Sequence, residues 1–222
     1  MANDGKWEIT KEFETEIVET RVVQVEVVSS EETRRLLVDR PVSWIALAGF
    51  MGTGKSRIGW ELSRRLSLTF IDTDKVIERV SCMRIGDIFE YYGEATFREY
   101  ESEVVRRTLR LDEVVISTGG GTVMRPQNRE MLKSRGPVIV LTASPETIYL
   151  RTRRSQRPLL QVANPIEKIY ELLETRKEAY GDVAAFHVST DNRHSSDVVE
   201  EIVEKLWLWQ EQQANGPKGT LE

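Results

Sequence analysis

The sequence is poor in the residues that build disulfide frameworks and zinc sites. Its 222 residues include a single cysteine, Cys82, and only two histidines. One cysteine excludes an internal disulfide and favours a reducing compartment. So few histidine and cysteine side chains cannot supply the ligands of a usual zinc site. Any bound metal is therefore expected to be a hard cation held by oxygen atoms.

Long apolar runs and a targeting segment are also missing. No stretch approaches the roughly 18 apolar residues that a membrane-spanning helix requires. The N-terminal segment lacks the hydrophobic core of a signal peptide, and it is too rich in glutamate for an organellar transit peptide. We therefore expect a cytoplasmic protein with no membrane partner.

The negative charge of the chain is concentrated near its N-terminus. The formal net charge is −5, and residues 1–40 hold 6 of the 31 Lys and Arg residues but 10 of the 36 Asp and Glu residues. The remaining chain is nearly balanced and has no basic stripe, which argues against nucleic acid as a partner. Such a domain must bind anionic ligands through a few focused arginines.

Residues 1–40 are expected to form an acidic N-terminal extension. Within it, Val23, Val25 and Val27 alternate with polar residues, as in a half-exposed strand. Ser29-Ser-Glu-Glu32 then offers a capping box for a short helix. A mobile acidic arm fits this segment as well as an ordered addition does.

From Pro41 onward, strand-like and helix-like patterns alternate, which implies right-handed crossovers around a parallel sheet and hence an α/β fold. This domain is expected over residues 41–209, and the Gly- and Pro-containing segment 210–222 is expected to be a frayed tail. Strands are predicted at 44–48, 69–72, 114–117, 137–141 and 187–189, and helices at 55–67, 75–80, 84–92, 95–110, 127–134, 145–154, 166–180 and 196–209.

The clearest motif directly follows the first predicted strand. Residues 49–56 read GFMGTGKS and fit the phosphate-binding pattern G-x-x-x-x-G-K-[ST]. Glycines let successive backbone N–H groups converge on phosphate oxygens, and the following helix adds its dipole to the anion site. Lys55 would reach the β- and γ-phosphates of a nucleotide, and Ser56 would ligate Mg²⁺. The alternative is a glycine-rich hairpin with Lys55 in solvent.

Further motifs follow the second and third predicted strands, at the sheet edge where α/β proteins bind ligands. In Asp72-Thr-Asp74, Asp72 could hold Mg²⁺ through water, and Asp74 could bind the hydroxyls of an acceptor and position or deprotonate the attacking one. One carboxylate could instead cap the helix that starts at Lys75. Gly119-Gly-Gly121 permits close approach of a ligand to backbone N–H groups, or forms a plain tight turn.

Arginines in three segments could recognise anionic groups. Arg98, at the end of GEATFR, has Glu101 three residues on, which allows either a surface ion pair or a fork that binds a carboxylate. The basic segment 151–160 is either solvated or able to place an arginine over a transferred phosphoryl group. Arg176 lies in a predicted helix, where a solvated position is the alternative.

Taken together, the motifs GFMGTGKS, DTD, GEATFR, GGG and RPLL resemble those of shikimate kinases, in this order and spacing, from about Trp44 to Leu206. The resemblance implies a three-layer P-loop kinase fold of the nucleoside-monophosphate-kinase type. Its five-stranded parallel sheet would be ordered 2-3-1-4-5, with helices on both faces and a mobile lid at about residues 151–165. It also implies transfer of the γ-phosphoryl group of ATP to the 3-hydroxyl of shikimate in aromatic amino-acid biosynthesis. We further expect Mg²⁺ as cofactor and a monomer.

The same resemblance assigns roles to individual residues. The catalytic residues would be Lys55, Asp74 and Arg157, the last in the lid, and Glu101 would hold the Arg98 guanidinium from behind. ATP would be bound by Gly52, Thr53, Gly54, Lys55, Ser56, Arg57, Arg151 and Arg157, with Arg151 packed against the adenine. Shikimate would be bound by Asp74, Arg98, Gly119, Gly120, Gly121 and Arg176. Mg²⁺ would be held by Ser56 and Asp72.

The chain departs from the family pattern in several places. Arg57 stands where the family commonly has a small hydroxyl residue, and the segment between Arg151 and Arg157 is one residue shorter than in many relatives. Ser189-Thr-Asp-Asn-Arg193 replaces an adenine-loop sequence such as D-T-N-R. The N-terminal extension is not part of the pattern.

Two other functions compete with this interpretation. One is a related kinase acting on gluconate or a nucleoside monophosphate. Two carboxylates at the acceptor site would repel a phosphate, which argues against the nucleotide, whereas gluconate carries hydroxyls and a carboxylate. The other is a nucleotide-binding module that docks a partner through its N-terminal arm. That function predicts a damaged catalytic set, but the sequence retains Lys55, Ser56, Asp72, Asp74, Arg98 and Arg157.

Overall fold

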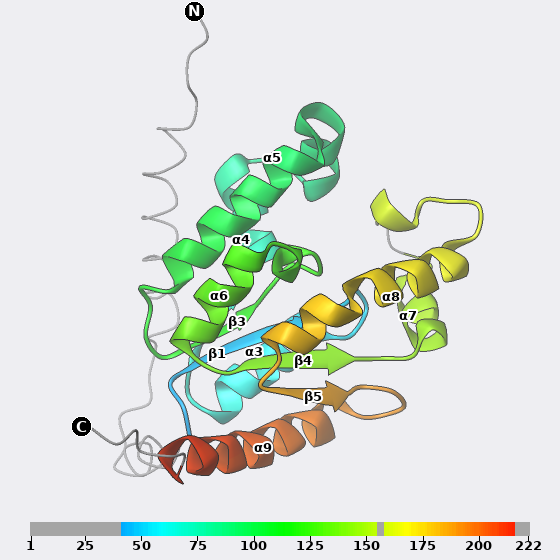
Figure 1. The fold of residues 1–222 in the computed structure, drawn as a ribbon. Coiled ribbons are helices and arrows are strands. Elements are labelled where there is room, and N and C mark those ends of the chain that lie inside the picture. The colour runs from blue at the N-terminus through cyan, green and yellow to red at the C-terminus, as the bar shows by residue number, and fades with distance from the viewer. Residues whose placement is uncertain (1–40, 155–157, 216–222) are drawn as a thin grey trace, which may run out of the picture.

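The computed structural model describes residues 41–154 and 158–215. These residues form a five-stranded parallel sheet with helices on both faces (Figure 1), and the strand order β2-β3-β1-β4-β5 confirms the predicted topology. The extension at residues 1–40, the central part of the expected lid at 155–157, and residues 216–222 lie outside the described residues. The strands are β1 (Trp44–Gly49), β2 (Thr69–Asp72), β3 (Val114–Ser117), β4 (Val138–Thr142) and β5 (Phe186–Ser189).

The helices follow the predicted alternation. The label α5 covers the two helices expected at 84–92 and 95–110, which meet at a kink where Gly93 is non-helical, with φ 79° and ψ 168°. The last helix continues past Gln210, through part of the segment expected to fray, to Asn215. The α-helices are α3 (Lys55–Arg65), α4 (Thr73–Ser81), α5 (Ile85–Thr108), α6 (Pro126–Arg135), α7 (Pro145–Thr152), α8 (Pro165–Val183) and α9 (Ser195–Asn215), and the 3-10 helices are η1 (Thr122–Met124) and η2 (Pro158–Leu160).

The central strand β1 is buried over its whole length, because helices cover both faces of the sheet. Trp44, Ala46 and Ala48 face the core formed with α4, α5, α6 and α8. Ile45 and Leu47 face the opposite core, formed with α3 and α9. This explains why β1 reads as a continuous apolar run rather than an alternating one. Among the described helices, none combines the length and apolar content needed to cross a membrane.

The parallel arrangement brings the sequence motifs to one edge of the sheet. The phosphate loop leaves the carboxyl end of β1, the DTD motif begins at the last residue of β2, and the glycine run follows β3. Because β1, β3 and β2 are neighbours in register, their carboxyl ends lie side by side. Three segments that are distant in sequence therefore meet where the site is expected.

Candidate active site

The loop from β1 to α3 is a tight turn that holds Lys55. Gly52 and Gly54 have φ of 80° and 87°, in the left-handed region that glycine adopts without strain. The Lys55 ammonium donates to the carbonyls of Gly49 (2.8 Å) and Phe50 (2.9 Å), and its side chain is buried. The alternative of a hairpin with Lys55 in solvent is therefore wrong, since this cation is folded back over the loop.

Ser56 and Asp72 lie together at the start of α3 and the end of β2. The Ser56 hydroxyl donates to Oδ2 of Asp72 at 2.6 Å. Oδ1 of Asp72 accepts from the backbone N–H groups of Asp74 (3.1 Å) and Lys75 (3.3 Å), and so caps α4. Asp72 thus has the capping role considered above and also faces Ser56. A hydroxyl and a carboxylate oxygen this close are suitable oxygen donors for Mg²⁺, directly or through water.

The glycine run is shaped by the carboxylates beside it. A Cβ atom on Gly119 would lie 2.4 Å from Oε1 of Glu101 and 2.7 Å from Oδ1 of Asp74. Such distances are far below van der Waals contact, so a residue with a side chain at this position would displace both carboxylates. The backbone N–H of Gly119 donates to the Thr73 hydroxyl at 3.1 Å. The run is therefore more than a tight turn, because it lets Asp74 and Glu101 approach the backbone.

Arg98 lies against the other end of the glycine run. A Cβ atom on Gly121 would be 2.3 Å from Nη1 of Arg98. The guanidinium donates to Glu101 at 2.5 Å and to Glu94 at 2.7 Å, and its side chain is 13% exposed. Burial disfavours its charge, but the Glu101 and Glu94 carboxylates outweigh burial and raise the pKa of Arg98. Arg98 is therefore a largely buried cation held in a fixed orientation, and the alternative of a solvated surface ion pair is wrong.

Arg176 reaches the same place from α8. Its Nη1 donates to the carbonyl of Gly120 at 3.0 Å, and its guanidinium carbon lies 5.2 Å from the centre of the Phe50 ring. Tyr180, one helical turn later, donates its hydroxyl to the same carbonyl at 2.7 Å. Burial raises the pKa of Tyr180 to about 12, so it remains a neutral donor. Arg176 is buried, and the solvated position that was the alternative is wrong.

This chain is similar in sequence to proteins of a known family. The family model described as shikimate kinase matches residues 51–207. A shikimate kinase of Deinococcus radiodurans is 54% identical over 178 residues, which cover 80% of this chain and 90% of that relative. The chain belongs to the shikimate kinase family. Enzymes of this family are kinases that transfer a phosphoryl group from ATP to shikimate, so the predicted family and enzyme class are confirmed.

Solved structures agree with this family. The shikimate kinase from Acinetobacter baumannii, solved in complex with shikimate, superposes with a TM-score of 0.73 at 36% identity and covers 80% of this chain and 96% of that one. A gluconokinase from Sinorhizobium meliloti superposes with a TM-score of 0.54 at 17% identity, over 79% of this chain and 97% of that one. The second likeness shows a shared fold and does not favour gluconate.

The shikimate kinase resemblance assigned three arginines to ATP, and the structure describes the contacts of two of them. Arg151 donates to the carbonyl of Gly52 (3.1 Å) and to both the hydroxyl (2.9 Å) and the carbonyl (2.7 Å) of Thr190, so it joins the phosphate loop to the segment after β5. Arg57 bonds instead to Glu61 (2.9 Å) and Ser195 (3.1 Å), with its side chain 77% exposed. The structure does not bring this side chain to the other site residues. Arg157 lies outside the described residues.

Two residues of this family site were not predicted from the sequence. Tyr180 follows Arg176 by four positions, and this spacing on one helix face could have indicated a shared target. Thr122 directly follows the glycine run and donates its hydroxyl to Glu101 at 2.6 Å. No local pattern reveals that contact, because Glu101 belongs to a different helix.

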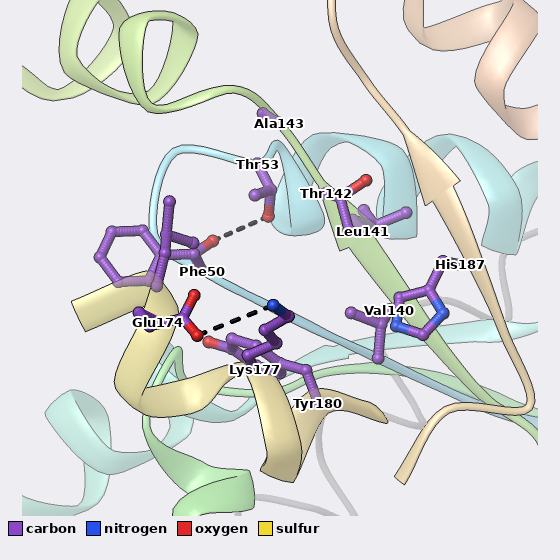
Figure 2. Close-up of a pocket in the computed structure, with 11 residues that line it drawn as sticks. Phe50, Thr53, Val140, Leu141, Thr142, Ala143, Glu174, Lys177, Tyr180 and His187 are labelled. Atoms are coloured by element: carbon purple, nitrogen blue, oxygen red, sulfur yellow. Dashed lines mark hydrogen bonds and ion pairs between the residues drawn. The ribbon is translucent and has the colours of Figure 1, made fainter. Parts of the chain in front are cut away.

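A cavity of about 330 Å³ lies beside the phosphate loop, between α8 and the neighbouring strands β4 and β5 (Figure 2). Phe50 and Thr53 contribute from the loop, and Tyr180 contributes from α8. Glu174 and Lys177 form an ion pair of 3.7 Å at its edge. The residues assigned to shikimate, Asp74, Arg98, Gly119, Gly120, Gly121 and Arg176, do not line this cavity. Tyr180 lines the cavity and also donates to the Gly120 carbonyl, so the cavity adjoins the acceptor site of the family.

Proposed function

We propose that this chain transfers the γ-phosphoryl group of ATP to the 3-hydroxyl of shikimate, releasing shikimate 3-phosphate and ADP in aromatic amino-acid biosynthesis. The observation that carries the proposal is the convergence of Asp74, Arg98 and Arg176 on one glycine run beside the Lys55 loop. A Cβ atom on Gly120 would lie 3.6 Å from the Gly49 carbonyl, which accepts from Lys55. An acceptor held on the glycine run would thus be close to a phosphate held in the loop.

On the nucleotide side, the glycine-rich loop and the N-terminus of α3 bind the phosphates. Lys55 stabilises charge on the moving phosphoryl group. Ser56 and Asp72 would hold Mg²⁺, which would neutralise charge on the phosphates when bound. Arg151 bonds to Thr190, in the segment after β5 where the adenine loop is expected. The family resemblance also assigns Arg157, which lies outside the described residues, to the phosphates.

On the acceptor side, Arg98 and Arg176 bind the carboxylate of shikimate, because the fork of a guanidinium matches a carboxylate. Asp74 accepts hydrogen bonds from the ring hydroxyls and orients the 3-hydroxyl for attack. The hydroxyl oxygen bonds to the γ-phosphorus as the bond to the bridging oxygen of ADP breaks. Asp74 accepts the hydroxyl proton or directs it to solvent.

The proposal is tested by following ADP release with shikimate, gluconate and AMP in parallel. We expect turnover with shikimate and rates at least about a hundredfold lower with the other two, because buried polar groups reject acceptors that leave them unpaired. Comparable kcat/KM for gluconate or AMP would contradict the acceptor assignment. ADP release without any acceptor must be subtracted, since water can also accept the phosphoryl group.

A second expected result concerns the N-terminal extension. Deleting residues 1–40 is expected to change kcat/KM for shikimate by no more than a few-fold, because β1 and its core begin at Trp44. The assay compares the full and shortened chains at equal concentrations of folded protein. Loss of soluble, active enzyme on truncation would instead show that the extension is part of the fold.

We also propose that the enzyme works as a monomer in the cytoplasm. Support for a monomer is that Lys55, Asp74, Arg98 and Arg176 come together within one chain. The exposed free thiol of Cys82 suits a reducing compartment. Sedimentation of the active enzyme at its assay concentration tests the oligomeric state.

A further inference from the structure

Glu101 is a buried carboxylate whose two oxygens have different partners. It lies on α5, and its side chain is 1% exposed. Oε2 accepts from Arg98 at 2.5 Å, and Oε1 accepts from the hydroxyl of Thr122 at 2.6 Å. Because a buried charge is costly unless its hydrogen bonds are made, both donors are needed to keep this carboxylate in place.

Thr122 is itself held firmly by the segment after the glycine run. It is fully buried at the start of η1, where its N–H donates to the Gly119 carbonyl at 3.2 Å. Its carbonyl accepts from the side-chain amide of Asn128, a buried residue of α6, at 2.8 Å. The Thr122 hydroxyl also lies in the space that a Cβ atom on Gly119 would enter, 3.1 Å from that position. Thr122 thus links η1 and α6 to the carboxylate of α5.

The orientation of Arg98 depends mainly on this buried carboxylate. Its other anion, Glu94, is 55% exposed, and exposed pairs fix an arginine only weakly. A threonine hydroxyl has one proton to donate, and here Glu101 receives it. Fixing Oε1 of Glu101 also fixes Oε2, which in turn fixes the guanidinium that lies against Gly121.

We propose that Thr122 is a positioning residue for the acceptor, which sets the orientation of Arg98 by holding Glu101. The inference rests on the proposed function, because it concerns how the same acceptor site recognises a carboxylate. It adds a residue that touches neither substrate and that acts through the contact between η1 and α5. The hydroxyl, rather than the shape of the side chain, is the active feature.

The test compares Thr122→Val, which removes the hydroxyl at nearly constant volume, with Thr122→Ser, which keeps it. We expect Thr122→Val to raise KM and the calorimetric Kd for shikimate about tenfold or more, as for loss of a hydrogen bond to a charged group. kcat should fall by less than about threefold, and Kd for ADP should not change, because Thr122 touches no nucleotide residue named above. Thr122→Ser should stay within about threefold of the wild type in KM and Kd for shikimate, in kcat and in Kd for ADP.

A double-mutant cycle separates this role from a general loss of packing. In a Glu101→Ala background, Thr122→Val should add little further increase in shikimate Kd, because the acceptor of the Thr122 hydroxyl is already gone. Additive effects, equal damage from the valine and serine variants, or an unchanged Kd for shikimate in Thr122→Val would each overturn the proposal. If Thr122→Val does not fold, Thr122→Ala is measured in the same way. Wild-type enzyme that does not phosphorylate shikimate would contradict the proposed function instead.

Discussion

Replacing Lys55 with alanine is expected to abolish turnover of shikimate while the protein remains folded. The Lys55 ammonium is the cation that the phosphate loop holds at the start of α3, by bonds to the carbonyls of Gly49 and Phe50. Removing one preorganised donor from a transition state costs on the order of a hundred- to a thousandfold in kcat. Lys55 is also assigned to the transferred phosphoryl group in the proposed arrangement, so we expect a loss at or beyond the upper end of this range.

The measurement is single-turnover phosphoryl transfer at saturating ATP and shikimate, with thermal unfolding of the variant as a check of the fold. Lys177→Ala is the matched control, because Lys177 is a lysine of α8 whose side chain is 76% exposed. The control should retain wild-type kcat. A near-normal kcat for Lys55→Ala would show that Lys55 is not a catalytic residue.

The second large effect is expected at the acceptor site. Arg98→Ala should lower kcat/KM for shikimate by roughly ten- to a hundredfold or more, because a hydrogen bond to a charged group contributes ~1.5–3 kcal/mol and about 1.4 kcal/mol is tenfold. Asp74→Asn should lower kcat further, because it disturbs the alignment of the attacking oxygen as well as its deprotonation. Neither residue is assigned to ATP. The calorimetric Kd for ADP without acceptor should therefore stay within a few-fold of wild type.

Two comparisons make this result specific. Arg106→Ala is the control on the same helix, since Arg106 forms an exposed ion pair with Glu103 and should change kcat/KM by less than about twofold. Arg157→Ala should have the complementary effect, reducing turnover while leaving the Kd for shikimate nearly unchanged. If Arg98→Ala weakened ADP binding as much as acceptor use, the division into a nucleotide side and an acceptor side would be wrong.

The parts of the fold predicted from sequence were those with a strong local signal. The continuous apolar run of β1 followed by GFMGTGKS predicts a buried strand and a phosphate loop without reference to the rest of the chain. The start of α4 at Thr73 instead of Lys75 reflects the cap made by Asp72. The last helix was predicted too short because Gly216 and Pro217 suggested an earlier end, whereas the residues from Glu211 to Asn215 continue the helix.

The site was harder to predict, because burial depends on residues far away in sequence. Arg98 and Arg176 have the same local appearance as solvated helix arginines. They become buried only because the glycine run after β3 lies between α5 and α8. Arg57 is the opposite case, because it was expected to bind ATP and is instead exposed. Its side chain is long enough to reach Glu61 and Ser195. Thr122 was missed because its partner, Glu101, comes from another helix.

The strand order has a consequence for how the protein is made. In the sheet, Trp44 of β1 is in register with Val114 of β3, and Ala46 is in register with Val138 of β4. The central strand is therefore synthesised well before either neighbour leaves the ribosome, at about 5–20 residues per second. During these seconds its apolar run has no sheet to join, and pairing over such a separation is intrinsically slow. We expect the nascent chain to be bound by chaperones that shield apolar segments until β4 has emerged.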